Sequence, residues 1–211
     1  MKNQSRQNII VCVSGGGRSL ENLLANQENS NYRVSAVISS NITCKANSIA
    51  KEHGIPVYCE HFPLDPASED YLANANKTKS FIASHSPELI VLAGFLRPFP
   101  LEICAPNIKT INIHPALLPK YGGHGMYGKK VHEAVIASDD KNSGASIHFV
   151  TPVYDEGKLI SQINVARHED DDANALAQRV FEAEKKLLPL TINMLLAGDL
   201  PTADNSIFKV F

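Results

Sequence analysis

The stretch IIVCVSGGGRSL, residues 9–20, sets the pattern that the rest of the chain repeats. An apolar run rich in β-branched residues (9–13) leads at once into a glycine-rich loop, and a helical pattern begins at Leu20. A strand that passes through a short loop into a helix is the repeating unit of parallel α/β sheets. The stretch therefore predicts an α/β fold.

Apolar runs and helical patterns alternate along the remaining sequence. The predicted strands cover residues 9–13, 34–38, 56–58, 89–93, 110–113, 145–150 and 159–165, and the predicted helices cover 20–25, 45–53, 71–84, 131–137 and 174–196. The early strands are apolar without interruption, which is typical of strands buried on both faces. We expect a single domain over residues 1–211, an open, mostly parallel, twisted sheet of about seven strands with helices on both faces. Ligands should gather at the carboxyl ends of the strands.

Charge and cysteine content narrow the function classes. The 211 residues carry a formal net charge of −2 and no basic cluster, which disfavours nucleic acid as a partner. Because no apolar stretch reaches the length of a signal peptide core or a membrane span, we expect a cytoplasmic protein that does not bind membranes. The four cysteines, Cys12, Cys44, Cys59 and Cys104, are too widely spaced to suggest zinc. Of the partner classes considered, small-molecule substrates are the one that these observations favour.

Asn112 and His114 lie two positions apart on a short apolar run that Pro115 ends. Side chains two apart on a strand point to the same face, so the amide and the imidazole should share the end of a strand. Asp155 follows in the turn YDEG, residues 154–157. An amide, an imidazole and a carboxylate suffice to transfer an acyl group without a covalent intermediate. An ordinary structural pair is the alternative interpretation of Asn112 and His114.

Three loops offer possible binding functions. SGGGRS, residues 14–19, suits a phosphate because glycines expose backbone N–H groups at a helix N-terminus, although a plain tight turn explains the same pattern. LAGFLRPF, residues 92–99, could form an apolar slot that binds a flat ring. The alternative is a loop at a strand end whose apolar side chains fill the core. YGGHGMYG, residues 121–128, has four glycines in eight residues and predicts a mobile flap.

The remaining signals favour structure over chemistry. His124 in the flap is interpreted as an exposed loop residue, and His148 as a structural strand histidine with no assigned chemistry. Pro189 predicts a kink or break in the last helix, and Gly198 predicts its end.

Taken together, SGGGRSLENLL (14–24), NIHPALLPKY (112–121) and YDEG (154–157) resemble the folate-dependent formyltransferases, most closely those of purine synthesis. The resemblance extends from about residue 9 to about residue 196. It implies the Rossmann-like formyltransferase fold and the transfer of a formyl group from 10-formyltetrahydrofolate, as co-substrate, to the amine of 5′-phosphoribosylglycinamide. It implies no metal, and it is compatible with a monomer or a homodimer.

The resemblance also implies roles for individual residues. Asn112, and His114 if it is protonated, would stabilise the tetrahedral oxyanion, while Asp155, rather than its neighbour Glu156, can keep His114 cationic and accept the amine proton through water. The implied binding residues are Gly17, Arg18 and Ser19 for the ribonucleotide phosphate, Glu184 for the ribose hydroxyls, and Leu96, Arg97, Pro98 and Phe99 with Asn112 for the folate.

The chain departs from the family pattern at three places. Arg18 stands where many relatives have a small hydroxylated residue, Phe181 stands where a polar or basic residue is common, and no arginine occurs within 66–71 to meet the folate tail. We predict that Arg18 replaces the phosphate contact missing at Phe181. The alternative is that Arg18 points into solvent and backbone amides alone bind the phosphate.

Three other functions match parts of the pattern. A methionyl-tRNA formyltransferase would add a basic C-terminal domain, which a chain of 211 residues with a net charge of −2 is not expected to contain. A formyltetrahydrofolate hydrolase usually carries an additional N-terminal domain, whereas about eight residues precede the first predicted strand. A non-catalytic nucleotide-binding module would explain the glycine loop but not Asn112, His114 and Asp155.

Overall fold

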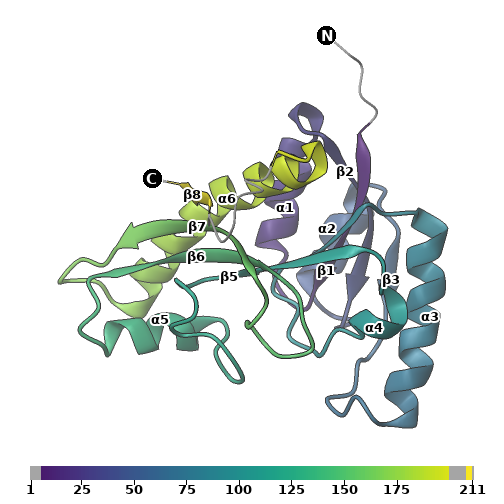
Figure 1. The fold of residues 1–211 in the computed structure, drawn as a ribbon, viewed down its shortest axis with the longest axis horizontal. Coiled ribbons are helices and arrows are strands. Elements are labelled where there is room, and N and C mark those ends of the chain that lie inside the picture. Colours follow the sequence, from purple (N-terminus) through teal and green to yellow (C-terminus); the bar gives the residue numbers. More distant parts are fainter. Residues whose placement is uncertain (1–5, 200–207, 211) are drawn as a thin grey trace. The chain divides into compact units, whose positions relative to one another are not determined.

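The computed structural model describes residues 6–199 and 208–210, and the chain forms two compact units, residues 1–111 and 112–211 (Figure 1). The boundary lies inside strand β5 (Lys109–His114). Every strand and helix expected from the sequence is present, with small shifts at the ends. The predicted α/β class with mostly parallel strands is confirmed, and the single domain stays a prediction beside this division.

The first unit is a parallel α/β layer structure. Its strands are β1 (Gln7–Val13), β2 (Tyr32–Ser39), β3 (Val57–Cys59) and β4 (Leu89–Leu92), in the order β3-β2-β1-β4. All three pairings among them are parallel. Successive strands are added on one side of β1 up to β3, and β4 is then added on the other side of β1. Open α/β sheets bind ligands in the crevice at such a switch point.

Three long helices and two short ones connect these strands. Helices α1 (Arg18–Asn26) and α2 (Lys45–Glu52) pack together, and α3 (Glu69–His85) lies on the other side of the strands (Figure 1). The sequence did not predict the short η1 (Gln27–Asn29) and α4 (Leu101–Cys104). Because helices cover both faces, residues 9–12 of β1 are fully buried, which explains their uninterrupted apolar sequence.

The second unit contains the end of β5 with β6 (Asn142–Phe149), β7 (Leu159–Ala166) and β8 (Phe208–Val210). Strands β6 and β7 are antiparallel, whereas β7 and β8 are parallel. Helix α5 (Lys129–Ile136) packs on α6 (Ala173–Ala197), and α6 also covers β6 and β7. The three-residue β8 was not predicted from the sequence.

Helix α6 tests two expectations from the sequence. It continues through Pro189, so the expected break does not occur. Its buried face supplies the reason, since packing of that face outweighs a cost of about 3 kcal/mol for an interior proline. The helix ends at Gly198 with φ 76°, as predicted, because glycine enters the left-handed region without a Cβ penalty.

Candidate active site

Four polar side chains meet in the second unit. Asn112 and His114 stand at the end of β5, His148 near the end of β6, and Asp155 in the turn before β7. One Asp155 oxygen, Oδ2, lies 3.5 Å from His114 Nδ1. The other, Oδ1, lies 3.4 Å from both His148 Nε2 and Asn112 Nδ2. The structure thus brings the three expected residues together and adds His148, which sequence interpretation had treated as structural.

Local backbone geometry explains this convergence. Asn112 and His114 alternate with Ile113 on an extended strand, so both side chains reach the same face. Asp155 itself adopts a left-handed conformation, with φ 58°, and its neighbour Glu156 is exposed, as expected. A Cβ atom at Gly157 would overlap the Phe149 carbonyl, so only glycine permits the chain to turn this tightly after Asp155.

Hydrogen bonds define which ring nitrogens carry protons. His114 Nε2 lies 2.8 Å from the Tyr121 carbonyl, which can only accept, so the proton sits on Nε2 and Nδ1 faces Asp155. His148 Nδ1 lies 2.9 Å from the Phe149 carbonyl, so Nε2 is the ring nitrogen that faces the cluster, 3.1 Å from Asn112 Nδ2 and 3.4 Å from Asp155 Oδ1. Both hydrogens of the Asn112 amide therefore face protein partners, and the longer contact, to Asp155, is the one that a ligand can replace.

Burial and charge set the protonation states of the pair. Burial lowers the pKa of His114, and although Asp155 and the Tyr121 carbonyl oppose this effect, the pKa stays below its usual value of 6.5. Burial raises the pKa of Asp155, but His148, His114 and the Gly123 amide together bring it below its usual value. At neutral pH we therefore expect a neutral His114 beside an ionised Asp155, so the protonated His114 considered from the sequence is not the resting form.

The glycine loop in the first unit is open at its centre and tight at its end. A Cβ at Gly17 (φ 80°) would lie 2.7 Å from Ile49 Cδ1 and 2.9 Å from Ala46 Cα, so packing against α2 requires this glycine. Gly15 and Gly16 are exposed, and a Cβ at either would have no neighbour within 4 Å. Packing thus explains Gly17 but not the other two, which leave the N-terminus of α1 accessible to an anion.

Arg18 and Ser19 open helix α1, where Arg18 is exposed and Ser19 half-buried. Both residues lie beside the exposed glycines, and their contact with a phosphate stays a prediction. Glu184 is half-buried on α6 of the second unit, with Phe181 also half-buried one turn earlier.

The segment 92–99 lies beside the glycine loop in the first unit. The Leu96 amide donates to Ser14 Oγ at 2.8 Å, and the Ser14 amide donates to the Gly94 carbonyl at 3.1 Å. Phe95 is buried, with its ring edge-on to Phe62, which is the plugging role considered from the sequence. The residues expected to meet folate, by contrast, retain exposed surface: Leu96, Arg97, Pro98 and Phe99.

Metal-binding groups, membrane spans and thiols can be located among residues 6–199 and 208–210, the part of the chain that the structure describes. Within them, no group of three or more His, Cys, Asp or Glu side chains is arranged to hold a metal ion. No helix there has the length and apolar character needed to cross a membrane. All four cysteines are free thiols, three of them buried.

Sequence interpretation missed two histidines near His114. His148 is 2% exposed. Its alternation with apolar neighbours, directly before the turn that carries Asp155, was the sequence signal that could have placed it in the site. His132 of α5 is also buried, and its Nδ1 has no hydrogen-bond partner in the described part of the chain. Burial lowers the pKa of His132, and a protonated His114 would lower it further, so we expect a neutral ring there.

Comparison with known proteins places this geometry in a family. Residues 7–192 match the formyl transferase family. The chain is 34% identical to the chloroplastic phosphoribosylglycinamide formyltransferase of Arabidopsis thaliana over 86% of its own length and 63% of that protein. It is 29% identical to the Escherichia coli K12 phosphoribosylglycinamide formyltransferase, over 94% of this chain and 92% of that one.

Solved structures agree with the sequence comparison. The phosphoribosylglycinamide formyltransferase of Coxiella burnetii is 30% identical, with a TM-score of 0.82, over 97% of this chain and 93% of that one. The chain spans about three fifths of the length of the plant relatives that it matches. The extent of the family match, together with the shared fold, establishes that the chain belongs to the formyl transferase family.

Proposed function

We propose that the protein transfers a formyl group from 10-formyltetrahydrofolate to the amine of 5′-phosphoribosylglycinamide, in purine synthesis. Relatives that match most of this chain carry the name of that enzyme. The observation that carries the proposal is the cluster of Asn112, His114, His148 and Asp155, in which both histidines are buried and contacts among the four side chains hold the geometry. Prearranged dipoles of this kind stabilise charge that develops during a reaction.

In the proposed reaction, the amine nitrogen attacks the formyl carbon, and the carbonyl electron pair moves to oxygen. The amine loses a proton, for which neutral His114 and ionised Asp155 are acceptors. Asn112 donates an N–H to the oxyanion once the 3.4 Å contact to Asp155 is released. The bond from carbon to the folate nitrogen then breaks, and that nitrogen takes the electron pair and a proton.

In this reaction, neutral His114 first accepts the amine proton and becomes an imidazolium cation only after that step. After it gains the proton, the Asp155 carboxylate and the Tyr121 carbonyl stabilise the imidazolium. The imidazolium can return the proton to the departing folate nitrogen, which balances the transfer. This order follows from the lowered pKa of His114, because a group that starts neutral has a site ready for the amine proton.

The substrate contacts belong to the same proposal. The ribonucleotide phosphate binds Gly17, Arg18 and Ser19, and the ribose hydroxyls bind Glu184. The exposed apolar surface and backbone groups of 96–99 suit a flat pterin ring. Residues assigned to the folate are Leu96, Arg97, Pro98, Phe99 and Asn112.

We further propose a cytoplasmic protein, monomeric or homodimeric, that acts on small molecules and requires neither a metal nor nucleic acid. Its formal net charge of −2 and the absence of a basic cluster support this view. Formyl folate serves as a co-substrate that is consumed, not as a resident group.

The test combines the protein with a 10-formyl folate analogue and glycinamide ribonucleotide, and follows folate absorbance together with the mass of the ribonucleotide. We expect one formylated ribonucleotide for each folate released, and no release without the ribonucleotide. Release of folate at the same rate without ribonucleotide would instead identify a hydrolase. Glu156→Ala, at the exposed neighbour of Asp155, is the control and should retain full activity.

A further inference from the structure

The backbone of Tyr121, Gly122 and Gly123 contacts both members of the acid–base pair. The Tyr121 carbonyl accepts from His114 Nε2 at 2.8 Å, and two residues later the Gly123 amide donates to Asp155 Oδ2 at 2.9 Å. The same Asp155 oxygen lies 3.5 Å from His114 Nδ1. A shift of this short segment would therefore move His114 and Asp155 relative to each other.

The segment is tightly placed. A Cβ at Gly122 would lie 2.5 Å from Leu118 Cδ2 and 3.2 Å from Asp155 Cβ, so the chain passes directly against Asp155. Tyr121 adopts φ 57°, a left-handed conformation that is unfavourable for a side chain of this size. Such a conformation persists only where surrounding contacts hold it.

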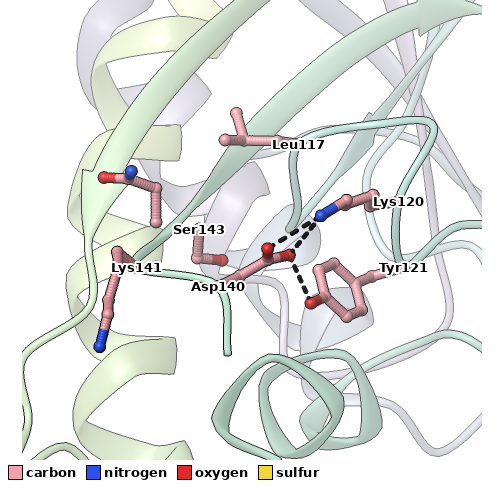
Figure 2. Close-up of a pocket in the computed structure, with 7 residues that line it drawn as sticks. Leu117, Lys120, Tyr121, Asp140, Lys141 and Ser143 are labelled. Carbon is pink, nitrogen blue, oxygen red and sulfur yellow. Dashed lines mark hydrogen bonds and ion pairs between the residues drawn. The ribbon is translucent and has the colours of Figure 1, made fainter. Parts of the chain in front are cut away.

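The Tyr121 side chain supplies that contact at its far end, as Figure 2 shows. Its hydroxyl lies 2.7 Å from Ser138 Oγ and 2.7 Å from Asp140 Oδ2. Because a carboxylate only accepts, the phenol donates its proton to Asp140. Lys120 Nζ lies 2.8 Å and 2.9 Å from the two Asp140 oxygens, which holds the pKa of Asp140 below its usual value, with a further contribution from Tyr121.

The connection that carries Ser138 and Asp140 is itself fixed. Arg167, directly after β7, donates to the carbonyls of Ser138 at 2.6 Å and Asp140 at 3.1 Å. The Asp140 amide also donates to Ser138 Oγ at 3.2 Å. The tyrosine hydroxyl thus attaches the segment 121–123 to a braced turn between α5 and β6, at the point where the glycine-rich flap begins.

We propose that the Tyr121 hydroxyl, held by Ser138 and Asp140, positions His114 and Asp155 through the backbone of residues 121–123. The inference rests on the proposed formyl transfer and extends it to residues to which the proposed reaction assigns no role. Tyr121 is a positioning residue: its side chain fixes a carbonyl and, two residues on, an amide, and these fix the pair that moves the proton. A misplacement of about 1 Å can cost about a hundredfold in rate, so a loosened anchor should be measurable.

Tyr121→Phe is the first test, because it removes only the hydroxyl. We expect kcat to fall by about tenfold or more, while the KM values of both substrates stay within about twofold. Tyr58→Phe, in the first unit, is the matched control and should leave both constants unchanged. An unchanged kcat in Tyr121→Phe, or a loss that appears only in KM, would overturn the proposal.

A second pair of variants separates the anchor from general packing. Ser138→Ala removes a partner of the tyrosine hydroxyl, whereas Ser143→Ala removes a buried hydroxyl that has no hydrogen-bond partner in the described part of the chain. Ser143 and Tyr121 both line one cavity of about 180 Å³. We expect only Ser138→Ala to lower kcat. Asp140→Asn, which keeps an acceptor, should retain more activity than Asp140→Ala.

Hydrogen exchange of the Gly123 amide tests the proposal without any assay of formyl transfer. We expect exchange at Gly123 to be several-fold faster in Tyr121→Phe than in the parent or in Tyr58→Phe. This arm decides the positioning claim even if the parent protein does not transfer formyl groups. Unchanged Gly123 exchange would overturn the proposal, including in the case where kcat falls.

Discussion

The glycine loop of the first unit and the Asn112–His114–His148–Asp155 cluster of the second unit represent two different ways to build a site. In the cluster, side chains contact one another and backbone carbonyls, and His114 and His148 are 4% and 2% exposed. In the loop, Gly15 and Gly16 are exposed, and the groups proposed to bind phosphate are backbone amides at a helix end. A prearranged cluster favours a role in the chemical step, whereas an open loop favours a role in binding.

Substitutions in the cluster should have the largest effect. We expect Asn112→Ala, His114→Ala and Asp155→Ala each to lower kcat by about a hundredfold or more, the scale found for oxyanion donors and proton acceptors. Steady-state kinetics measures the loss, and circular dichroism checks that the fold is kept. Near-normal turnover in folded His114→Ala protein would remove the cluster from the mechanism.

Arg18 should have a smaller effect of a different kind. If its guanidinium binds the ribonucleotide phosphate, Arg18→Ala should raise the KM for the ribonucleotide by about tenfold and leave the folate KM and kcat nearly unchanged. Arg33→Ala, at an arginine that binds Asn8 in the same unit, is the control. An unchanged ribonucleotide KM at low salt would leave the phosphate to the backbone amides alone.

The pH dependence of kcat tests the neutral form of His114. A proton acceptor works only in its neutral form, which predominates above its pKa and disappears as the pH falls through that pKa. Because the pKa of His114 lies below the usual 6.5, kcat should be constant near pH 7 and decline at a pH below 6.5. The decline should approach about tenfold for each pH unit. A kcat that rises as the pH falls would instead require the imidazolium as the active form.

The smallest effect concerns the flap, residues 122–128. Its glycines favour an open ensemble, so we expect several-fold slower hydrogen exchange when both substrates are bound. The change in exchange should be smaller at the start of the flap than at residues 124–128, because the Gly123 amide already donates a hydrogen bond to Asp155. Equal exchange at residues 124–128 with and without substrates would contradict a closing flap.

These two regions also differ in how much the sequence reveals. Period-2 alternation placed Asn112 and His114 on one face, and the strand–loop–helix pattern placed the glycine loop at the start of α1. Contacts between residues distant in sequence carry no such local signal. The meeting of Asn112 with His148, 36 residues on, depends on how β6 lies in the fold, so a buried strand histidine was taken as structural.

The same reasoning explains the other discrepancies. Pro189 breaks the local rule for a helix, and only the packing of α6 on β6 and β7 shows that the helix continues. The protonated His114 expected from the nearby carboxylate is disfavoured by burial, which a sequence does not display. The three-residue strand β8 is too short to give a periodic signal.

A single-turnover experiment tests the division between chemistry and binding most directly. Protein in excess over labelled formyl folate, with saturating ribonucleotide, reports the rate of formyl transfer itself. We predict that His114→Ala slows this rate by about a hundredfold or more, whereas Arg18→Ala leaves it within about twofold of the parent. A slow transfer in Arg18→Ala at saturation, or an unchanged rate in folded His114→Ala, would contradict the account.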